Sequence, residues 1–406
     1  MKLALVSAKY PFGGKEPYLH AELRNLAPYF DRVTVFPTSP PDAAWGFEGV
    51  AGDVRRMGLF APSTLAGAFA ALATRPASSV RALWSLFRAP YPAKVKLKNI
   101  AVVPLGLAVG MRLRRERYDH VHSYWLSTPA TVAFVAAHVA GIPWSSTGHL
   151  WDIYENNALA AKLPSARFVR AISARGRRDL YAALADSTVA YIEVVHVGVD
   201  VPAEPQRDAH DAPLGAARPF SLLCAANLVL KKGHADLLEA LAELRDRGVD
   251  VHCTIAGDGE LRDTLRDKAA ALGVDANVTF RGHVAHAALL DEIRAGAYDA
   301  MVLTSLELPG GLMEGIPVAL MEAMALGLPV VTTDTGSIGE LVDDTCGRLV
   351  DQRNVTAIAA AIAELAEDAD LRASLARAAH AKVAADFNVV SVARRLAQLI
   401  GSDRAR

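Results

Sequence analysis

The hydrophobic and polar positions of this chain follow a repeated order: a short apolar run, a loop interrupted by Gly or Pro, and a run of good helix formers. The clearest example is residues 300–343, AMVLTSLELPGGLMEGIPVALMEAMALGLPVVTTDTGSIGELVD. There an apolar run ends at Thr304, Pro317 opens a run of helix formers, and Gly327 ends it before a second apolar run. Proline is favoured at the start of a helix and glycine just past its end. The segment therefore predicts strand, loop, helix and strand in a parallel α/β sheet.

The same alternation runs through both halves of the chain, which predicts an α/β protein with two doubly wound domains. Residues 201–217 are polar and Pro-rich, a composition typical of linkers. We therefore expect a first domain at residues 1–205 and a second domain at residues 213–387.

Composition narrows the class of protein. The 406 residues, 52% of them hydrophobic, are enough for two or three domains with large cores. The net charge of −1, from 43 basic and 44 acidic residues, gives no overall field that would attract nucleic acid. The cysteines Cys224, Cys253 and Cys346 lack C-x-x-C spacing and fit a reducing compartment. Because no secretory signal or membrane-spanning apolar stretch is convincing, we expect a cytoplasmic protein.

One segment departs from this charge balance. Residues 88–117 contain a single acidic residue, Glu116, and the basic residues Arg88, Lys94, Lys96, Lys98, Arg112, Arg114, Arg115 and Arg117. The aromatic residues Trp84, Phe87 and Tyr91 lie beside them. Such a mixture suits peripheral contact with an anionic membrane, here the inner face of the cytoplasmic membrane. A solvated helix face would give the same pattern, so both interpretations stay open.

Two carboxylates flank the start of the helix in the 300–343 segment. Glu314 precedes the helix and Glu322 lies eight residues later. If the first turn is helical, their side chains project about 80° apart. The backbone at this helix start is free to hold an anion such as a diphosphate, through Gly315, Ile316, Pro317 and Val318. The helix dipole alone also favours acidic residues here, which is the alternative explanation.

Other candidate residues lie in loops after predicted strands. Gly13 and Gly14 follow the first apolar run and would let a backbone approach a phosphate or sugar. Because the sequence has no G-x-G-x-x-G there, it argues against a dinucleotide-binding site. Lys231 and Lys232 follow the first strand of the second half and could neutralise a diphosphate, although a solvated lysine pair is the alternative.

The segment MEGIPVALMEAMALGLPVVTTDTGSIGELV resembles the signature of glycosyltransferase family 4. The insertion LELPGGLMEGIP is similar to that of colanic-acid-type and other exopolysaccharide glycosyltransferases. The resemblance implies a GT-B fold with two Rossmann-like domains facing a central cleft, and a last helix, about 388–406, that packs back on the first domain. It also implies retaining, metal-independent transfer of a sugar from a UDP- or GDP-sugar to an acceptor hydroxyl. The acceptor would be a saccharide or lipid-linked sugar in polysaccharide or glycoconjugate biosynthesis, and no cofactor is required.

The resemblance assigns roles to the catalytic candidates. Glu314 would position the donor sugar and Glu322 the ribose. Lys232 falls on the lysine of the motif G-R-L-x-x-x-K-G-h, but Asn227 stands where that motif has arginine. His149 matches the histidine of T-x-H-G-x-D and would contact the transferred sugar.

Further residues follow from the same resemblance. The donor-side positions, where relatives bring backbone to the nucleotide, are Gly257, Gly259, Arg281, Gly282 and His283. The acceptor-side positions are Glu16, His20 and Asp152. Two alternatives remain: another enzyme on this fold, such as a phosphorylase or epimerase, and an inactive nucleotide-sugar-binding protein, which Asn227 favours.

Overall fold

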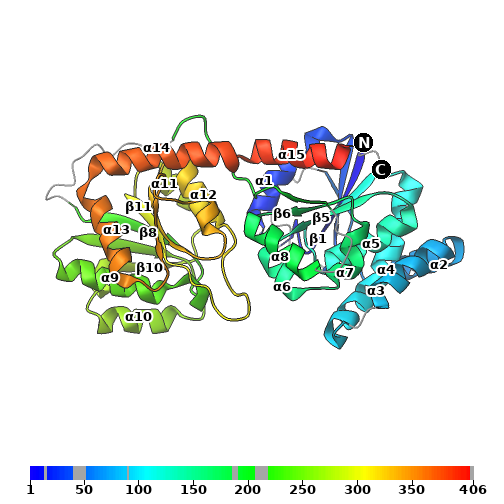
Figure 1. Ribbon diagram of the computed structural model, residues 1–406, viewed down its shortest axis with the longest axis horizontal. Coiled ribbons are helices and arrows are strands. Elements are labelled where there is room, and N and C mark those ends of the chain that lie inside the picture. Colours follow the sequence, from blue (N-terminus) through cyan, green and yellow to red (C-terminus); the bar gives the residue numbers. More distant parts are fainter. Residues whose placement is uncertain (13–15, 40–51, 89–90, 185–190, 206–217, 403–406) are drawn as a thin grey trace. The chain divides into compact units, whose positions relative to one another are not determined.

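The structure is a computed structural model of the chain (Figure 1). It describes residues 1–12, 16–39, 52–88, 91–184, 191–205 and 218–402. The chain divides into two units, one of Met1–Gly198 with Val389–Arg406 and one of Val199–Asn388. The structural division therefore falls a few residues before the predicted linker, and the last helix groups with the first unit.

The first unit is built on a parallel sheet in the order β3-β2-β1-β4-β5-β6-β7. Its described strands are β1 Lys2–Ser7, β2 Arg32–Pro37, β3 Asp53–Val54, β4 His120–Ser123, β5 Trp144–Gly148, β6 Phe168–Ala171 and β7 Tyr191–Val194. Its described α-helices are α1 Pro17–Leu26, α2 Pro62–Thr74, α3 Pro76–Phe87, α4 Ala93–Glu116, α5 Thr128–Ala140, α6 Leu150–Glu155, α7 Leu159–Lys162, α8 Ala174–Leu184 and α15 Val389–Gly401.

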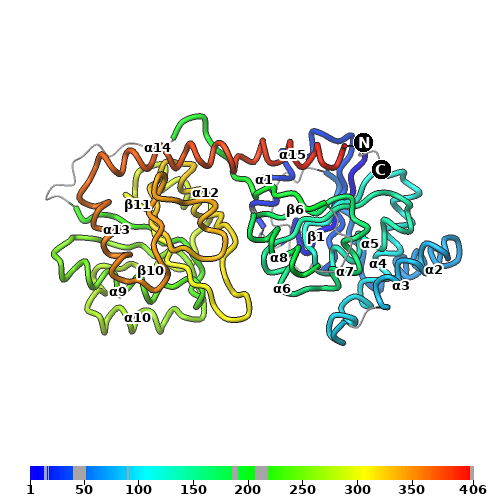
Figure 2. The backbone as a smooth tube through the Cα atoms, in the orientation of Figure 1, coloured from blue at the N-terminus to red at the C-terminus, as the bar shows by residue number. Residues whose placement is uncertain are grey.

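Both faces of this sheet are covered, as the nearly continuous apolar strands require. Successive side chains of β1 point to opposite faces. Leu3 and Leu5 join the apolar cluster that contains α1 and α15, whereas Ala4 and Val6 join the cluster that contains α4 and α5. Figure 2 shows α15, at the red end of the chain, beside α1, at the blue end.

The second unit repeats this plan in the order β10-β9-β8-β11-β12-β13, again with parallel pairing. Its described strands are β8 Phe220–Ala225, β9 Val251–Ala256, β10 Val278–Gly282, β11 Ala300–Leu303, β12 Val330–Asp334 and β13 Arg348–Asp351. Its described α-helices are α9 His234–Asp246, α10 Arg262–Ala271, α11 His286–Arg294, α12 Val318–Ala325, α13 Val355–Glu367 and α14 Ala369–Asp386.

Each sheet contains a point at which the strand order reverses. In the first sheet the chain runs outward from β1 to β3 and then returns to β4, on the other side of β1. In the second it runs outward from β8 to β10 and returns to β11, on the other side of β8. Open α/β sheets bind ligands at this point, beyond the carboxyl ends of the two diverging strands. The loops after β1 and β4, and those after β8 and β11, are therefore the places to examine.

The basic segment 88–117 is mostly one helix with a buried second half, and its predicted membrane contact stays a prediction. Most of it is α4, whose second half is a core helix packed on α5. An added Cβ at Gly106 would lie 2.9 Å from the Cβ of Val135, and one at Gly110 would lie 2.7 Å from the Cβ of Val139. Glycine thus permits the close approach of the two helices, and exposed basic residues remain only toward the ends of α4. None of the helices in the described ranges is both long and apolar enough to cross a membrane.

Candidate functional site

The loops after β8 and β11 are locked together at the reversal point of the second sheet. The hydroxyl of Thr304 donates to the carbonyl oxygen of Gly233 at 2.9 Å, and the Leu306 amide donates to the carbonyl oxygen of Lys231 at 2.8 Å. Gly233 has φ of +64°, and a Cβ there would lie 1.8 Å from the Thr304 carbonyl oxygen. Only glycine fits this contact, so the local sequence fixes where the two preceding lysines, Lys231 and Lys232, lie.

Two lysines from the first loop converge on one carboxylate from the second. Lys231 Nζ lies 2.9 Å from Oε1 of Glu314, and Lys232 Nζ lies 3.0 Å from Oε2. Glu314 is 7% exposed. Burial raises the pKa of this carboxyl group, but the two ammonium groups outweigh burial and hold the pKa below its ordinary value. Two cations and one anion leave a net positive charge at this edge, which suits an anionic ligand.

The start of α12 adds backbone donors to the same place. Pro317 is the N-cap residue, and the N–H groups of Gly315, Ile316 and Val318 donate no backbone hydrogen bond within the described residues. Free N–H groups at the positive end of a helix dipole favour an anion. Because α12 begins only at Val318, Glu314 lies in the loop and not on the helix. Glu314 precedes the helix, as predicted, but the turn that carries it is not helical, so the angle of about 80° to Glu322 does not apply.

Glu322 lies on α12 and is held by α11. His286 Nε2 lies 2.7 Å from Oε1 of Glu322, and the side chain of Glu322 is 19% exposed. The hydrogen bond to Glu322 raises the pKa of His286 above its ordinary value, despite partial burial. The carboxylate is thus accessible and already oriented by a partner that can also become a cation.

Two glycine turns bring backbone to this edge. The amide of Gly257, after β9, donates to the carbonyl oxygen of Gly282, at the end of β10, at 2.9 Å. Added Cβ atoms would lie 1.9 Å from the Ala226 carbonyl oxygen at Gly257 and 2.4 Å from the Leu228 carbonyl oxygen at Gly259. These glycines therefore pack the turn after β9 against the loop that carries the lysines.

The predicted site residues around these turns differ in how their side chains are exposed and paired. Asn227 and His283 are exposed. Arg281 is occupied by Glu292 at 2.5 Å and by the Tyr298 hydroxyl at 3.2 Å, and its hydrogen bond to Glu292 raises its pKa. The side chain of Arg281 is thus already paired within the second unit, and its backbone contact with a nucleotide stays a prediction.

At the reversal point of the first sheet, the predicted residues Glu16 and His149 both contact Trp125. Oε1 of Glu16 accepts a hydrogen bond from Trp125 Nε1 at 3.0 Å, and Oε2 accepts one from the Tyr10 amide at 3.1 Å. The ring of His149 stacks on Trp125 with centroids 4.1 Å apart. Burial raises the pKa of Glu16, although its hydrogen bonds and the nearby His149 oppose this shift. His20 contacts Tyr10, whose hydroxyl lies 3.1 Å from His20 Nδ1.

Asp152 is buried and holds neighbouring backbone groups in position; it does not lie on the surface. It has no exposed area, and its Oδ2 accepts from the amides of Leu126 at 3.1 Å and His149 at 3.3 Å. Behind it, the buried ammonium group of Lys162 donates to the carbonyl oxygens of Leu126 at 2.8 Å and Ser127 at 3.1 Å. Burial lowers the pKa of Lys162 to about 7. Together these residues fix the loop after β4.

Gly13 and Gly14 lie outside the described residues. In the described part of the chain, no group of three or more His, Cys, Asp or Glu side chains is arranged to hold a metal ion.

Several residues at these edges were not selected from the sequence. Trp125 directly follows an apolar run, a position that could have identified it. His286 opens a helix and carries no motif, and Lys162 resembles any helical lysine in sequence. Lys231 was selected with Lys232 as a possible partner of a diphosphate, but its ion pair with Glu314 was not predicted.

The second unit matches a known protein family. Residues 206–382, nearly the whole second unit, match the family described as "Glycosyl transferases group 1". Over its full length the chain resembles the crystal structure of Anabaena Alr3699/HepE in complex with UDP. That match has a TM-score of 0.71 at 22% identity and covers 98% of this chain and 99% of the other. The fold is therefore the GT-B fold, and the predicted pair of Rossmann-like α/β domains is confirmed.

Curated relatives are more similar in sequence. The chain is 36% identical over 214 residues to "Putative colanic acid biosynthesis glycosyltransferase WcaL" of Salmonella typhimurium, which covers 52% of this chain and 50% of the relative. It is 29% identical over 320 residues to "GDP-mannose-dependent alpha-(1-6)-phosphatidylinositol monomannoside mannosyltransferase" of Mycobacterium tuberculosis, which covers 74% and 82%. The chain thus spans about half the length of the first relative. The predicted similarity to colanic-acid-type glycosyltransferases is confirmed.

Proposed function

We propose that the protein is a glycosyltransferase that moves a sugar from a nucleotide diphosphate sugar to an acceptor hydroxyl, in polysaccharide or glycoconjugate biosynthesis. The observation that carries the proposal is the convergence of Lys231 and Lys232 on Glu314 at the reversal point of the second sheet. The two ammonium groups that pair with this buried carboxylate can instead pair with the diphosphate of an incoming donor.

We propose that donor binding exchanges partners at this site. The diphosphate would take over the two lysines and the N–H groups at the start of α12. Glu314, released from the lysines, would then accept hydroxyl groups of the donor sugar. Glu322 would accept the ribose hydroxyls, with His286 keeping its carboxylate in place.

Lys231 fits the role left vacant at Asn227. The family motif places a permanent cation at that position, and Asn supplies only neutral donors. Lys231 already lies as close to Glu314 as Lys232 does, at 2.9 Å against 3.0 Å. We infer that the lysine pair replaces the usual arginine and lysine pair in stabilising the leaving diphosphate.

The finer features of the reaction are also proposals. Membership of family 4 and retention of configuration rest on the sequence signature. Independence of a metal would follow if the two lysines and the start of α12 offset the charge of the leaving group. A UDP-sugar is supported by the UDP complex of the Anabaena protein, and a GDP-sugar by the name of the mycobacterial relative. A cytoplasmic location remains the prediction from composition.

We propose that the edge of the first sheet binds the acceptor. Glu16 and His149 meet there around Trp125, and an aromatic face beside polar groups is suited to a saccharide. Asp152 would act by positioning His149 and the loop after β4. His20 would contribute from α1, beside Tyr10.

A thermal-shift screen of the full chain with UDP, GDP, ADP and CMP tests the donor site. A ligand that binds only the folded state raises the melting temperature by mass action. We expect one nucleoside diphosphate to raise it selectively, and the rise to be lost in Lys232→Met. No shift with any nucleotide would contradict the proposed donor site.

A further inference from the structure

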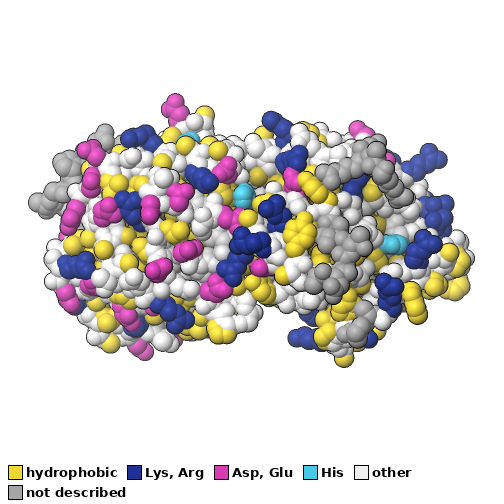
Figure 3. Space-filling view, in the orientation of Figure 1, with side chains coloured by type: hydrophobic (Ala, Val, Ile, Leu, Met, Phe, Trp, Pro, Cys, Tyr) yellow, Lys and Arg dark blue, Asp and Glu magenta, His cyan; other side chains and the backbone are white. Residues whose placement is uncertain are grey.

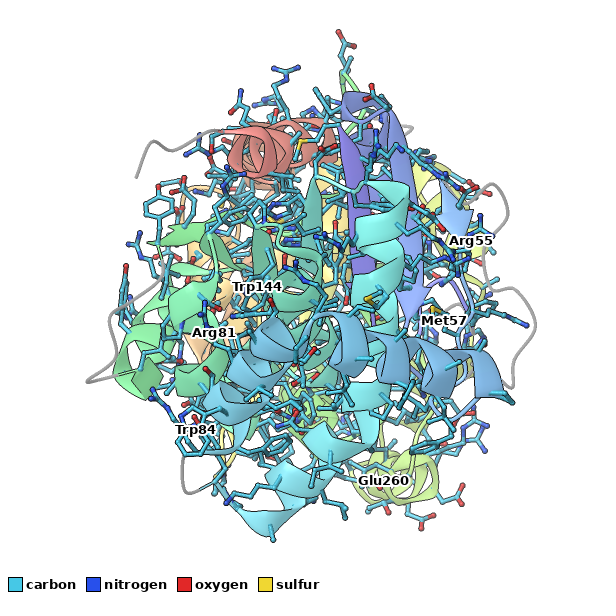
Figure 4. The ribbon with its side chains drawn as sticks, turned by 90° about the vertical axis from the view of Figure 1, so that its right-hand side faces the viewer. Arg55, Met57, Arg81, Trp84, Trp144 and Glu260 are labelled. Atoms are coloured by element: carbon cyan, nitrogen blue, oxygen red, sulfur yellow. The ribbon has the colours of Figure 1, made fainter. Side chains whose placement is uncertain are left out.

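A buried polar side chain ordinarily has a hydrogen-bond partner in this protein. On β12 the hydroxyl of Thr332 donates to the carbonyl oxygen of Leu303 at 2.8 Å. In the first unit the buried Trp144, labelled in Figure 4, donates to the Ser165 hydroxyl at 3.1 Å. Such pairing is the rule in protein interiors, because a polar group that is removed from water and left unpaired costs free energy.

Three buried groups of the second unit depart from this rule. They are the imidazole of His234 and the hydroxyls of Ser305 and Thr335, which have no hydrogen-bond partner in the described part of the chain. Surface groups such as the Lys, Arg, Asp and Glu side chains in Figure 3 can bind water instead. The three residues are only 2%, 0% and 3% exposed, so bulk water does not reach them. We call these three side chains the unpaired groups.

Two of the unpaired groups lie where the loops after β8 and β11 are locked together. His234 begins α9, directly after Gly233. Ser305 directly follows Thr304, whose hydroxyl donates to the carbonyl oxygen of Gly233 at 2.9 Å. Both groups therefore belong to the contact that positions the lysine pair of the proposed donor site.

The third unpaired group lies in a turn that packs on the Glu314 loop. Thr335 follows β12 and precedes Gly336, which has φ of +62°. An added Cβ at Gly336 would lie 1.8 Å from the carbonyl oxygen of Glu314. Two residues before Thr335, the hydroxyl of Thr333 donates to the carbonyl oxygen of Ser305 at 2.5 Å. The unpaired groups thus come from three loops that are packed together around the lysine pair and Glu314.

The chemistry of the unpaired groups indicates which partner they lack. Burial, and to a smaller extent the charge of Lys232, lowers the pKa of His234 to about 4, so its imidazole is neutral. A neutral imidazole has one N–H donor and one acceptor nitrogen, and a hydroxyl both donates and accepts. An ionised diphosphate offers only acceptors, so it cannot satisfy the acceptor nitrogen. A sugar hydroxyl offers a donor and an acceptor and can pair with all three groups.

We propose that His234, Ser305 and Thr335 bind hydroxyl groups of the transferred sugar, so that the donor makes hydrogen bonds that the ligand-free protein leaves unmade. This inference rests on the proposed function, because it takes the donor site to hold a nucleotide diphosphate sugar. It extends the sugar contacts of that site beyond Glu314. The unpaired groups lower the stability of the ligand-free protein, and part of that cost is recovered when the sugar binds.

Apolar replacements of similar shape test the proposal, because they remove an unpaired group with little change in packing. The variants of the full chain are Ser305→Ala, Thr335→Val and His234→Leu. Each should raise the melting temperature of the ligand-free protein by roughly 2–4 °C, since an unpaired buried group is removed. We then use calorimetry with a panel of UDP- and GDP-sugars. The sugar nucleotide that the unmodified chain binds best should bind about tenfold more weakly to each variant, whereas the affinity for free UDP or GDP should hardly change.

Thr332→Val is the matched control, because this buried hydroxyl on β12 has its partner in the protein. The control should lower the melting temperature and leave both affinities unchanged. If the three variants lower the melting temperature as the control does, buried water already satisfies the unpaired groups and the proposal is wrong. Equal losses of affinity for the sugar nucleotide and the free nucleotide would also overturn it.

The same titrations separate this inference from the proposed function. Normal binding of UDP or GDP, with unchanged binding of the sugar nucleotide in all three variants, would contradict this inference alone. A chain that binds no nucleoside diphosphate and no sugar nucleotide would contradict both.

Discussion

Replacing Glu314 by glutamine tests the charge arrangement of the proposed donor site. The substitution keeps the side-chain shape but removes the negative charge that pairs with both Lys231 and Lys232. Two opposite effects should follow. The ligand-free protein should become less stable, because two partly buried ammonium groups lose their counter-charge. The affinity for a nucleoside diphosphate should rise, because the ligand no longer competes with an internal carboxylate.

The structure sets the scale of both effects. Removing one partner of a fully buried ion pair costs about 3–5 kcal/mol. Here the Lys232 side chain is 16% exposed and that of Lys231 is 36% exposed, so solvent screens part of the interaction. We therefore expect Glu314→Gln to lower the free energy of unfolding by about 1–3 kcal/mol. We expect roughly tenfold tighter binding of the diphosphate, about 1.4 kcal/mol, together with a loss of turnover because the sugar contact is gone.

Urea unfolding and calorimetric titration measure the two effects. Glu364→Gln is the matched control, because Glu364 pairs with Arg348 at 2.7 Å but its side chain is 48% exposed and lies outside the lysine loops. The pKa of Glu314 is lowered in the folded state. Its contribution to stability should therefore be present above the ordinary Glu pKa and disappear as the pH falls through the lowered value. If Glu314→Gln is no less stable than Glu364→Gln and binds the diphosphate no more tightly, the proposed exchange of partners is wrong.

Three further predictions concern single residues. Glu322→Ala should weaken nucleotide binding in calorimetry about tenfold, and an unchanged affinity would exclude the ribose role. Asn227→Arg should preserve or raise turnover, since it restores a cation beside Lys231; a collapse of turnover in a folded variant would show that Asn227 has a substrate-specific role. Lys162 has a folded-state pKa of about 7, so the unfolded chain binds the extra proton between pH 7 and about 10. The stability of the unmodified chain relative to Lys162→Met should therefore increase over that range in urea unfolding, and a flat difference would refute the lowered pKa.

The fold could be predicted because its determinants are local. The alternation of apolar runs, glycine or proline loops and helix formers is enough to indicate doubly wound α/β domains. The 300–343 segment illustrates this, since Pro317 and Gly327 flank α12 in the structure as well. The helix pattern could not show that Pro317 is the N-cap residue and that the turn before it is not helical.

The site could be predicted only as far as its motifs reach. Glu314 and Glu322 belong to one contiguous signature and Lys232 to a separate short motif, so their positions in sequence suffice to select them. The pairing of Lys231 with Glu314 and of His286 with Glu322 depends on the packing of loops and helices far apart in sequence.

The properties of the surface could also be predicted only in part from the sequence. Composition identified basic residues in the 88–117 segment but not that α4 is buried against α5. The apolar outer face of α2 is visible only once its inner face is known, because both faces are hydrophobic in sequence.

The central claim is that the lysine pair at the reversal point of the second sheet stabilises a leaving nucleoside diphosphate. The most direct measurement is the release of UDP or GDP from a panel of UDP- and GDP-sugars by the full chain without acceptor, compared with Lys232→Met. We predict slow release from one class of donor by the unmodified chain and its loss in the variant, with nucleotide binding weakened as well. Tight binding of a nucleotide sugar without any release would contradict the account and indicate an inactive binding protein, and equal release by Lys232→Met would place the chemistry elsewhere.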